Sequence, residues 1–360
     1  MIDLHTLPDE LIHRFMESKN DLLNHVNERM LNDPHAFTLI GGQHNIQVML
    51  DNHRNHISFI GIVLKLRQTS LLLKTLPWVY QSYHNQGFSY DYFPYVLKMW
   101  KEALWACISD VDVSPVQKLY DVMIDLHKNN MEKSRELDTF KTDHGLNSSQ
   151  NEYLQVLLSG NQRGLFQLTD AYMTEGNSIE GYYMQLVQPV MYAIGRKWER
   201  GEISVAHEHL ASAMVARIMA SFYNYVELPE ISKGKILISS AANEYHEIGA
   251  WMTANMFELH GWDVYYLGAN TPVNDLLGIL DSFQPDFLGL SVTMAYNLES
   301  ILNIIFSIKA NEELQGIQIL LGGHIFSSFP ELRDSLEADY IAEDFRDALE
   351  YADSILEGWS

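Results

Sequence analysis

The stretch SSAANEYHEIGAWM, residues 239–252, decides the fold of the second half of the chain. A short apolar run, residues 236–238, leads into it, and apolar side chains at helical spacing follow it. A strand, a polar loop and a helix are therefore expected in that order. Glu244 and His246 fall in the loop, so a histidine beside a carboxylate stands at the end of a buried strand.

Strand and helix patterns alternate from residue 235 to the end of the chain. Thr271-Pro272 is expected to cap and start one of the helices. The alternation predicts a doubly wound, five-stranded parallel sheet of the flavodoxin-like type. The expected strands are KILIS (235–239), DVYYL (263–267), DFLGLS (286–291), IQILLG (317–322) and the weaker DYIA (339–342).

Polar or glycine-rich loops follow three of these strands, at residues 244–246, 291–294 and 322–324. In the expected strand order the three strands are neighbours, so their loops should surround one mouth at the carboxyl edge of the sheet, where open parallel sheets bind ligands. No GxGxxG follows the first strand and no P-loop occurs, so nucleotide binding has little support.

The chain before the sheet reads as two helical segments, which makes the fold class α plus α/β. We expect three domains, at residues 1–138, 150–228 and 233–360, with a linker at ELDTFKTDHGLNSSQNE (136–152). The middle domain should be a four-helix bundle with breaks at SGNQ, EGNS and ERGEIS. In the last of these, Gly201 suits a helix end and Ser204 a helix cap.

Composition narrows the classes of function. Lys and Arg total 24 against 47 Asp and Glu, a net charge of −23, which argues against general binding to nucleic acid or anionic membranes. The single cysteine, Cys107, allows no intrachain disulfide and fits a reducing cytoplasm. No secretory signal or apolar run of about 20 residues is present.

The loops form a set that resembles the cobalamin-binding domain family, over residues 235 to about 357. The pattern here is E-x-H-x-x-G, S-x-T and G-G, where the family has D-x-H-x-x-G, S-x-L and G-G. The resemblance implies that His246 is the lower ligand of cobalt, that Glu244 holds its other ring nitrogen, and that the nucleotide tail lies past the Ser and Gly-Gly positions. The cofactor-binding residues that it implies are Glu244, His246, Gly249, Ser291, Thr293, Gly322 and Gly323.

The stretch KWERGEISVAHEHLASAM, residues 197–214, resembles the four-helix cap of photoreceptors that bind adenosylcobalamin. The shared spacing is W-x9-E-H, and the resemblance implies that the adenosyl group is enclosed by Trp198, Val205, Glu208 and His209. DNA-binding members of that family carry a cobalt-capturing histidine after the tryptophan. This chain has Glu199 there, so capture would fall to His207 or His209, and the family's N-terminal helix-turn-helix is absent.

The stretch YHNQGFSYDYFPYVLKMWKEAL, residues 83–104, resembles the F-to-G turn of globins. Tyr83 falls on the ligand position and His84 one residue away, which turns its side chain by about 100° and argues against haem ligation. Two resemblances remain: globin-like sensors without haem, and photocobilins, which join a cobalamin domain to a bilin-binding domain. The second implies a non-covalent bilin such as biliverdin. Its candidate contacts are Asp51, His53, Arg54, His56, Tyr83, His84, Tyr90 and Tyr92.

Simpler interpretations of the N-terminal residues stay open. His53 and His56 could be a solvated or capping pair, the aromatic residues a helix core, and Cys107 a buried core residue and not a thioether site.

The expected function is a cytoplasmic, non-enzymatic light sensor that binds adenosylcobalamin and a bilin. It would signal by photolysis-driven rearrangement of its domains or of a homo-oligomer, through a protein partner that the sequence does not name. The alternatives are a corrinoid carrier in methyl transfer, for which Trp198 and Glu208 would be incidental, and a haem-globin sensor fused to a cobalamin domain.

Overall fold

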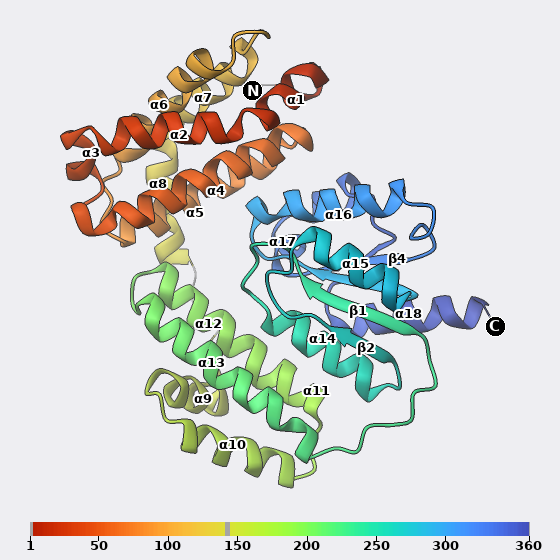
Figure 1. The fold of residues 1–360 in the computed structure, drawn as a ribbon. Helices are drawn as coiled ribbons and strands as arrows, with labels where there is room; N and C mark the ends of the chain where they lie inside the picture. The colour runs from red at the N-terminus through yellow and green to blue at the C-terminus, as the bar shows by residue number, and fades with distance from the viewer. Residues whose placement is uncertain (1–2, 141–144, 360) are drawn as a thin grey trace. The chain divides into compact units, whose positions relative to one another are not determined.

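The structure is a computed structural model that describes residues 3–140 and 145–359 (Figure 1). The chain divides into two compact units. The first unit comprises Met1–His144 together with Arg196–Ile203, and the second comprises Gly145–Gly195 and Ser204–Ser360. In the described residues, no helix combines the length and apolar character needed to cross a membrane.

The first unit is helical, as expected. Helix α2 packs against α4 and α6, α5 packs against α8, and α6 packs against α7. Fully buried aromatic side chains, among them Phe15, Trp100 and Tyr120, fill the space between these helices. The helices are α1 (Asp9–Glu17), α2 (Lys19–Leu31), α3 (Pro34–Leu39), α4 (Ile46–Lys65), α5 (Thr69–Asn85), α6 (Tyr92–Cys107), α7 (Ser114–Asp125) and α8 (His127–Phe140), with short 3-10 turns at Leu4–Thr6 and Gln43–Asn45.

The boundary between the two units falls between His144 and Gly145, inside the expected linker at residues 136–152, and helices reach into both ends of that stretch. Helix α8 continues to Phe140 and α9 begins at Ser148, where Asn147 and Gln150 form a capping box. Residues 141–144 of the linker lie outside the described residues.

The turn between α5 and α6 has a local explanation. Gly87, at φ 98°, donates to the carbonyl of His84, and Phe88 donates to the carbonyl of Tyr83. The Tyr83 and Phe88 rings pack with centroids 5.4 Å apart. Paired bonds of this kind, a glycine of positive φ and a hydrophobic contact across the end define a Schellman helix end, so the sequence that resembles a globin turn stops α5 here.

His53 lies in the core of the first unit and His56 is partly buried, so the expectation of a solvated or capping pair is wrong. His53 has no exposed surface; its Nδ1 lies 2.6 Å from Asn27 Oδ1 and its Nε2 lies 3.0 Å from the Tyr92 hydroxyl. His56 Nε2 lies 3.1 Å from the Tyr120 hydroxyl. Burial lowers the pKa of His53 to about 3 and, together with the nearby His53, that of His56 to about 3.

The second unit begins with the expected helical bundle. Its helices are α9 (Ser148–Leu158), α10 (Gln162–Thr174), α11 (Ile179–Tyr182), α12 (Gln188–Glu199) and α13 (Val205–Ser221), and a π-helical segment, Tyr183–Val187, joins α11 to α12. All three expected breaks fall between helices. Three hydroxyl groups form a buried hydrogen-bonded chain in the bundle core. The Tyr182 hydroxyl lies 2.7 Å from the Thr169 hydroxyl and 3.0 Å from the Tyr153 hydroxyl.

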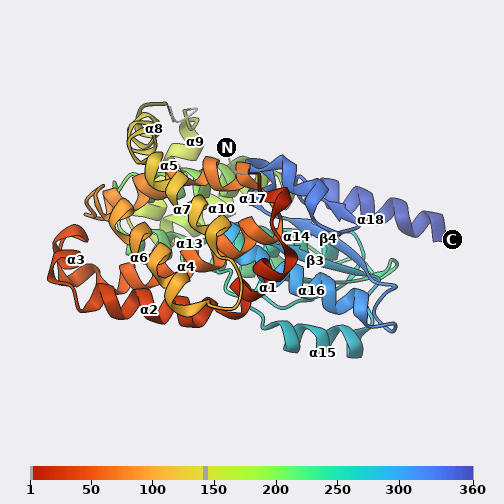
Figure 2. The ribbon, with the colours of Figure 1, turned by 90° about the horizontal axis from the view of Figure 1, so that it is seen from above.

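A five-stranded parallel sheet follows in the order β2-β1-β3-β4-β5, which confirms the expected architecture. Helices α14 and α18 pack together on one face, and α15 and α16 lie side by side on the other (Figures 1 and 2). The strands are β1 (Lys235–Ser240), β2 (Asp263–Tyr266), β3 (Phe287–Ser291), β4 (Gln318–Gly322) and β5 (Tyr340–Ile341). The helices are α14 (Ile248–Leu259), α15 (Val273–Phe283), α16 (Leu298–Ala310), α17 (His324–Ser328) and α18 (Phe345–Trp359).

The register of the sheet brings its three functional loops to one level. Ser240 at the end of β1 pairs with Ser291 at the end of β3, and Ser291 pairs with Gly322 at the end of β4. One detail differs from expectation: α15 starts at Val273 with Pro272 as its N-cap. Thr271 instead accepts a hydrogen bond from the Ser239 hydroxyl, at 2.9 Å.

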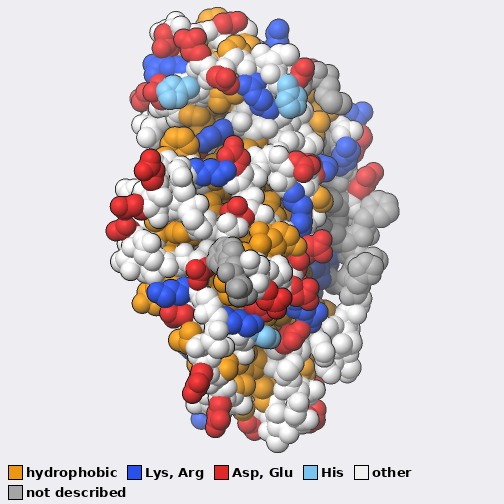
Figure 3. Space-filling view, turned by 90° about the vertical axis from the view of Figure 1, so that its right-hand side faces the viewer, with side chains coloured by type: hydrophobic (Ala, Val, Ile, Leu, Met, Phe, Trp, Pro, Cys, Tyr) orange, Lys and Arg blue, Asp and Glu red, His pale blue; other side chains and the backbone are white. Residues whose placement is uncertain are grey.

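The bundle and the sheet make polar contacts inside the second unit. Asn255 on α14 donates to the buried hydroxyl of Tyr183, in the π-helical segment, at 2.6 Å. Arg346 on α18 pairs with Glu180 on α11. On the face in Figure 3, Lys and Arg side chains of the described residues are scattered among Asp and Glu without gathering into a basic patch, in keeping with the net charge.

Gly323 and Gly322 provide a matched test of the sheet edge. Gly323 has φ 112°, and a Cβ there would lie 2.1 Å from the Val292 carbonyl oxygen, whereas a Cβ on Gly322 meets nothing within 4 Å. Gly323→Ala should lower the free energy of unfolding by about 3 kcal/mol, and Gly322→Ala by well under about 1 kcal/mol. Urea unfolding measures both, and equal effects would contradict the assigned close approach.

His53 should make the stability of the first unit pH-dependent. Its folded pKa of about 3 lies below the unfolded value of about 6.5, so its contribution is complete above pH 6.5 and is lost as pH falls toward 3. Between pH 7.5 and pH 5 this loss amounts to about 2 kcal/mol. Chemical unfolding at the two pH values should show a smaller difference in His53→Gln, while His5→Gln, an exposed control, should behave as the wild type.

Candidate functional site

A buried carboxylate organises the loops at the carboxyl edge of the sheet. Glu244 has no exposed surface, and its Oε2 accepts hydrogen bonds from two backbone amides and one side chain of the segment after β3. The donors are Thr293 N at 2.8 Å, Met294 N at 3.0 Å and Asn297 Nδ2 at 3.1 Å. Burial alone would raise the pKa of Glu244, but bonds from His246 and from the two backbone amides outweigh it and lower the pKa.

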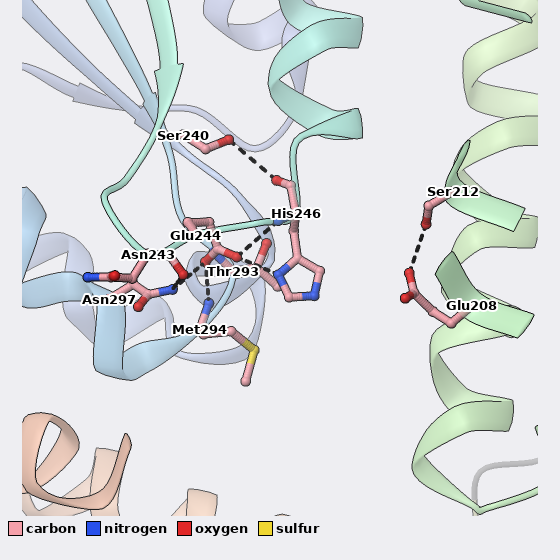
Figure 4. Close-up of polar contacts among 9 residues, drawn as sticks. All are labelled: Glu208, Ser212, Ser240, Asn243, Glu244, His246, Thr293, Met294 and Asn297. Carbon is pink, nitrogen blue, oxygen red and sulfur yellow. Dashed lines mark hydrogen bonds and ion pairs between the residues drawn. The ribbon is translucent and has the colours of Figure 1, made fainter. Parts of the chain in front are cut away.

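His246 is oriented by the other oxygen of that carboxylate. Its Nδ1 pairs with Glu244 Oε1, and its backbone N donates to the same atom at 3.2 Å. With Nδ1 as donor, the lone pair is on Nε2, and Figure 4 shows that this nitrogen points away from Glu244. Burial lowers the pKa of the imidazole, but Glu244, and at longer range Glu208, raise it above the ordinary value.

His246, as a single protein ligand, fits a metal whose other ligands come from a macrocycle. A carboxylate on Nδ1 and a free Nε2, with the ring 57% exposed, is the usual arrangement of a metal-bound histidine. Across the described residues, no three His, Cys, Asp or Glu side chains gather into a metal site. His246 would therefore supply one ligand, and the rest of the coordination would come with the cofactor.

A cavity of about 120 Å³ lies along β1, β3 and β4. Four expected residues line it: Gly249, Ser291, Gly322 and Gly323. A Cβ on Gly249 would meet nothing within 4 Å, as at Gly322, so larger side chains at either position would project into open space. The cavity therefore depends on the absence of side chains at the strand ends.

Thr293 does not line the cavity; its backbone N holds Glu244 instead. Sequence reasoning also missed Asn297, which donates to Glu244 from the start of α16, and the cavity residues Gln188, Tyr192 and His324. The i, i+4 spacing of Gln188 and Tyr192, and the place of His324 directly after Gly-Gly, were signals that could have found three of them.

Val205, Glu208 and His209, which were expected to enclose the adenosyl group above the cobalt, lie in the first turns of α13. Glu208 Oε1 accepts a hydrogen bond from the Ser212 hydroxyl at 2.8 Å (Figure 4). Glu208 Oε2 contacts His209 Nδ1 at 2.6 Å. The side chain of Val205 is exposed. His207, one of the alternatives for cobalt capture, contacts the Ser204 hydroxyl at 2.8 Å.

Trp198 and Glu199 lie in the part of α12 that belongs to the first unit. Trp198 is partly buried. Glu199 accepts a hydrogen bond from Trp78 Nε1, on α5, at 2.9 Å. Glu199, which stands where the resembling photoreceptors carry a histidine, is thus bonded to the N-terminal helices.

The expected bilin contacts fall into two groups in the first unit. Asp51 and Arg54 form an ion pair at 2.8 Å on the surface of α4. The others bond or pack within the unit: His53 and His56 as described, His84 stacked on Tyr90 at 3.9 Å, and Tyr83 and Tyr92 buried so that the pKa of each is raised. Cys107 is partly buried at the end of α6, so it is not the core residue that was expected. A bilin stays a prediction.

Comparisons with known proteins identify the second unit. Residues 149–222 and 234–352 each match a model described as a B12 binding domain. The HTH-type transcriptional repressor CarH of Myxococcus xanthus is 27% identical over 139 residues, which cover 39% of this chain and 46% of CarH. Dimethylamine corrinoid protein 3 of Methanosarcina mazei is 25% identical over 168 residues, which cover 46% of this chain and 99% of that protein.

The solved monomethylamine corrinoid protein of Methanosarcina barkeri has the same fold, with a TM-score of 0.51 at 16% identity over 59% of this chain and 99% of its own. The chain spans about half the length of CarH. The fold, the histidine–carboxylate pair and these matches together define a cobalamin-binding protein.

Glu244→Gln should damage both the loop and the histidine. The Gln amide turns donors toward donors, so at least one buried hydrogen bond is lost, at a cost of about 3 kcal/mol in the free energy of unfolding. The pKa of His246 should fall, because the carboxylate that raises it is gone. Urea unfolding and an NMR titration test this, with Glu247→Gln in the same loop as control; similar results for both variants would contradict the role of Glu244.

Proposed function

We propose that this cobalamin-binding protein is a light sensor whose ligand is adenosylcobalamin. It would be regulatory and not an enzyme, and would signal through a change in its homo-oligomeric state or through a protein partner. Bound adenosylcobalamin would supply a Co–C bond that light breaks. His246 would hold the cobalt from below, and Ser291, Gly322 and Gly323 would line the space for the nucleotide tail.

The observation that carries the proposal is the position of Glu208. Figure 4 shows the Glu208 carboxylate, on α13, turned toward the histidine that would bind cobalt, and this negative charge adds to the larger effect of Glu244 in raising the pKa of His246. Ser212 holds that carboxylate at 2.8 Å. A carboxylate accepts hydrogen bonds from ribose hydroxyls, whereas a methyl ligand has no donor to offer. Glu208 therefore favours a nucleoside as the upper ligand.

The upper-face residues complete the proposal by resemblance. Trp198 and Val205 would pack against the adenosyl group, and His209, bonded to Glu208, would limit how that carboxylate turns. Thr293 and Gly249 would act below, the first by holding Glu244 and the second by leaving room beside His246.

The proposal also includes a non-covalent bilin, such as biliverdin, on the first unit. This part rests on the sequence resemblance of the N-terminal helices. Absorption spectra of the protein mixed with biliverdin or with haem test it. A shifted red band with biliverdin supports a second pigment, and a sharp Soret band with haem favours a haem sensor. No spectral change with either would contradict tetrapyrrole binding by the first unit.

The second candidate function is a corrinoid carrier in methyl transfer. It is supported by the match to a dimethylamine corrinoid protein over 99% of that protein. In that case the protein would dock on a methyltransferase partner and Glu208 would have no preference between upper ligands.

Glu208→Gln distinguishes the two functions. Loss of a charged acceptor should weaken adenosylcobalamin about tenfold and leave methylcobalamin unchanged. Glu152→Gln, an exposed carboxylate of the same bundle, is the matched control. Titration followed by absorbance measures both affinities. Equal losses for the two cobalamins would favour the methyl carrier.

His246→Ala tests the lower ligand and light tests the sensor. The variant should lose the spectrum of histidine-ligated cobalamin or bind more weakly. Size-exclusion chromatography of the wild type with adenosylcobalamin should give different elution in the dark and after green light. Unchanged elution after photolysis that absorbance confirms would contradict the sensor.

A further inference from the structure

The turn between α12 and α13 is bonded to the N-terminal helices, although its sequence belongs to the bundle. Arg196–Ile203 clusters with the first unit. Two donors on α5 reach one residue of the turn. Trp78 Nε1 donates to Glu199 Oε1 at 2.9 Å, and Asn85 Nδ2 donates to the Glu199 carbonyl at 2.7 Å. Glu199 is thus held at both its side chain and its backbone.

The turn has a defined backbone of its own. Gly201, at φ 68°, donates to the Trp198 carbonyl at 2.9 Å, and Glu202 N donates to the Lys197 carbonyl at 2.9 Å, the paired bonds of a Schellman end. The Lys197 and Glu202 side chains close it with an ion pair at 2.7 Å. A Cβ on Gly201 would lie 3.3 Å from the Asn85 carbonyl oxygen, so glycine also lets the end of α5 approach.

One face of α5 makes both contacts. Trp78 and Asn85 are seven residues apart, which is close to two full turns, so their side chains leave the helix in nearly the same direction. Asn85 is the last residue of α5, and the Schellman end at Gly87 fixes where the helix stops. The two hydrogen bonds to Glu199 therefore depend on where α5 ends, and both donors lie on the helix and not on a loop.

We propose that Glu199 is a positioning residue, through which Trp78 and Asn85 of the N-terminal helices fix the backbone that carries Trp198. The inference rests on the proposed function, in which Trp198 packs against the adenosyl group. The position that holds a cobalt-capturing histidine in the resembling DNA-binding photoreceptors would here link the N-terminal helices to the upper face of the cofactor. By linkage, a bound adenosyl group would in turn stabilise the α5 contact.

Removal of the two donors tests whether their hydrogen bonds to Glu199 hold the turn between α12 and α13. Trp78→Phe deletes an indole N–H and keeps an aromatic ring, and Asn85→Ala deletes the amide. In ligand-free protein, each change should speed hydrogen exchange at the Gly201 and Glu202 amides about fivefold, and the double variant about 25-fold. Trp105→Phe, which alters an exposed tryptophan of the same unit, should leave exchange unchanged.

Cofactor affinity separates a positioning role from a structural one. The double variant should bind adenosylcobalamin at least fivefold more weakly, on the order of one hydrogen bond, and methylcobalamin as the wild type does. Glu199→Gln keeps a side-chain oxygen for Trp78 and the backbone carbonyl for Asn85, so it should behave as the wild type. Glu199→Ala loses the side-chain oxygen and should behave as Trp78→Phe. If Trp78→Phe fails to fold, Glu199→Ala carries the test.

Each outcome has one meaning. Faster exchange with selective loss of adenosylcobalamin supports the inference. Unchanged exchange, or faster exchange with unchanged adenosylcobalamin affinity, overturns it. A separate result would contradict the proposed function: the wild type binds adenosylcobalamin and methylcobalamin equally, and Glu208→Gln does not change this. In that case the role of Glu199 in positioning Trp198 against the adenosyl group is also wrong, even if hydrogen exchange shows that α5 holds the turn.

Discussion

Burial of the Glu244 carboxylate is the constraint on which the site depends. A charged carboxylate without exposed surface is stable only if hydrogen bonds replace its hydration. The loop after β1 cannot supply them alone, so Glu244 takes three donors from the segment Thr293–Asn297 after β3. The remaining oxygen orients His246. One buried charge therefore couples two loops and sets the tautomer of the imidazole.

The sheet makes this coupling possible through its register. Because Ser240, Ser291 and Gly322 stand level on adjacent strands, the loops that follow them start from one line. Gly323 then passes so close to the Val292 backbone that no side chain fits. The cavity along these strands is the space left when the strand ends carry small residues, and α12 contributes Gln188 and Tyr192 to its lining.

The bundle adds chemistry that the sheet lacks. Glu208, held by Ser212, places a second carboxylate where it acts on His246 through space. The preceding turn is shaped by its own Schellman end and bonded to α5 through Glu199. A sensor needs a ligand-dependent element that other parts of the chain can detect, and this turn joins the residue proposed to meet the ligand to the N-terminal helices.

The sequence by itself determined the elements that depend on local physics. The alternation of strand and helix patterns predicted the five strands of a parallel sheet, and Gly201 and Ser204 marked the end of α12 and the start of α13. The contact between Glu244 and a ring nitrogen of His246 was implied by the resemblance to cobalamin-binding domains, and the structure contains it. Only the tertiary structure decided which atoms meet across long separations. Thr293 acts through its backbone, His53 is buried against Asn27 and Tyr92, and Glu199 pairs with Trp78, 121 residues away. Whether a polar side chain is solvated or buried depends on partners that the fold supplies, and no local pattern encodes them.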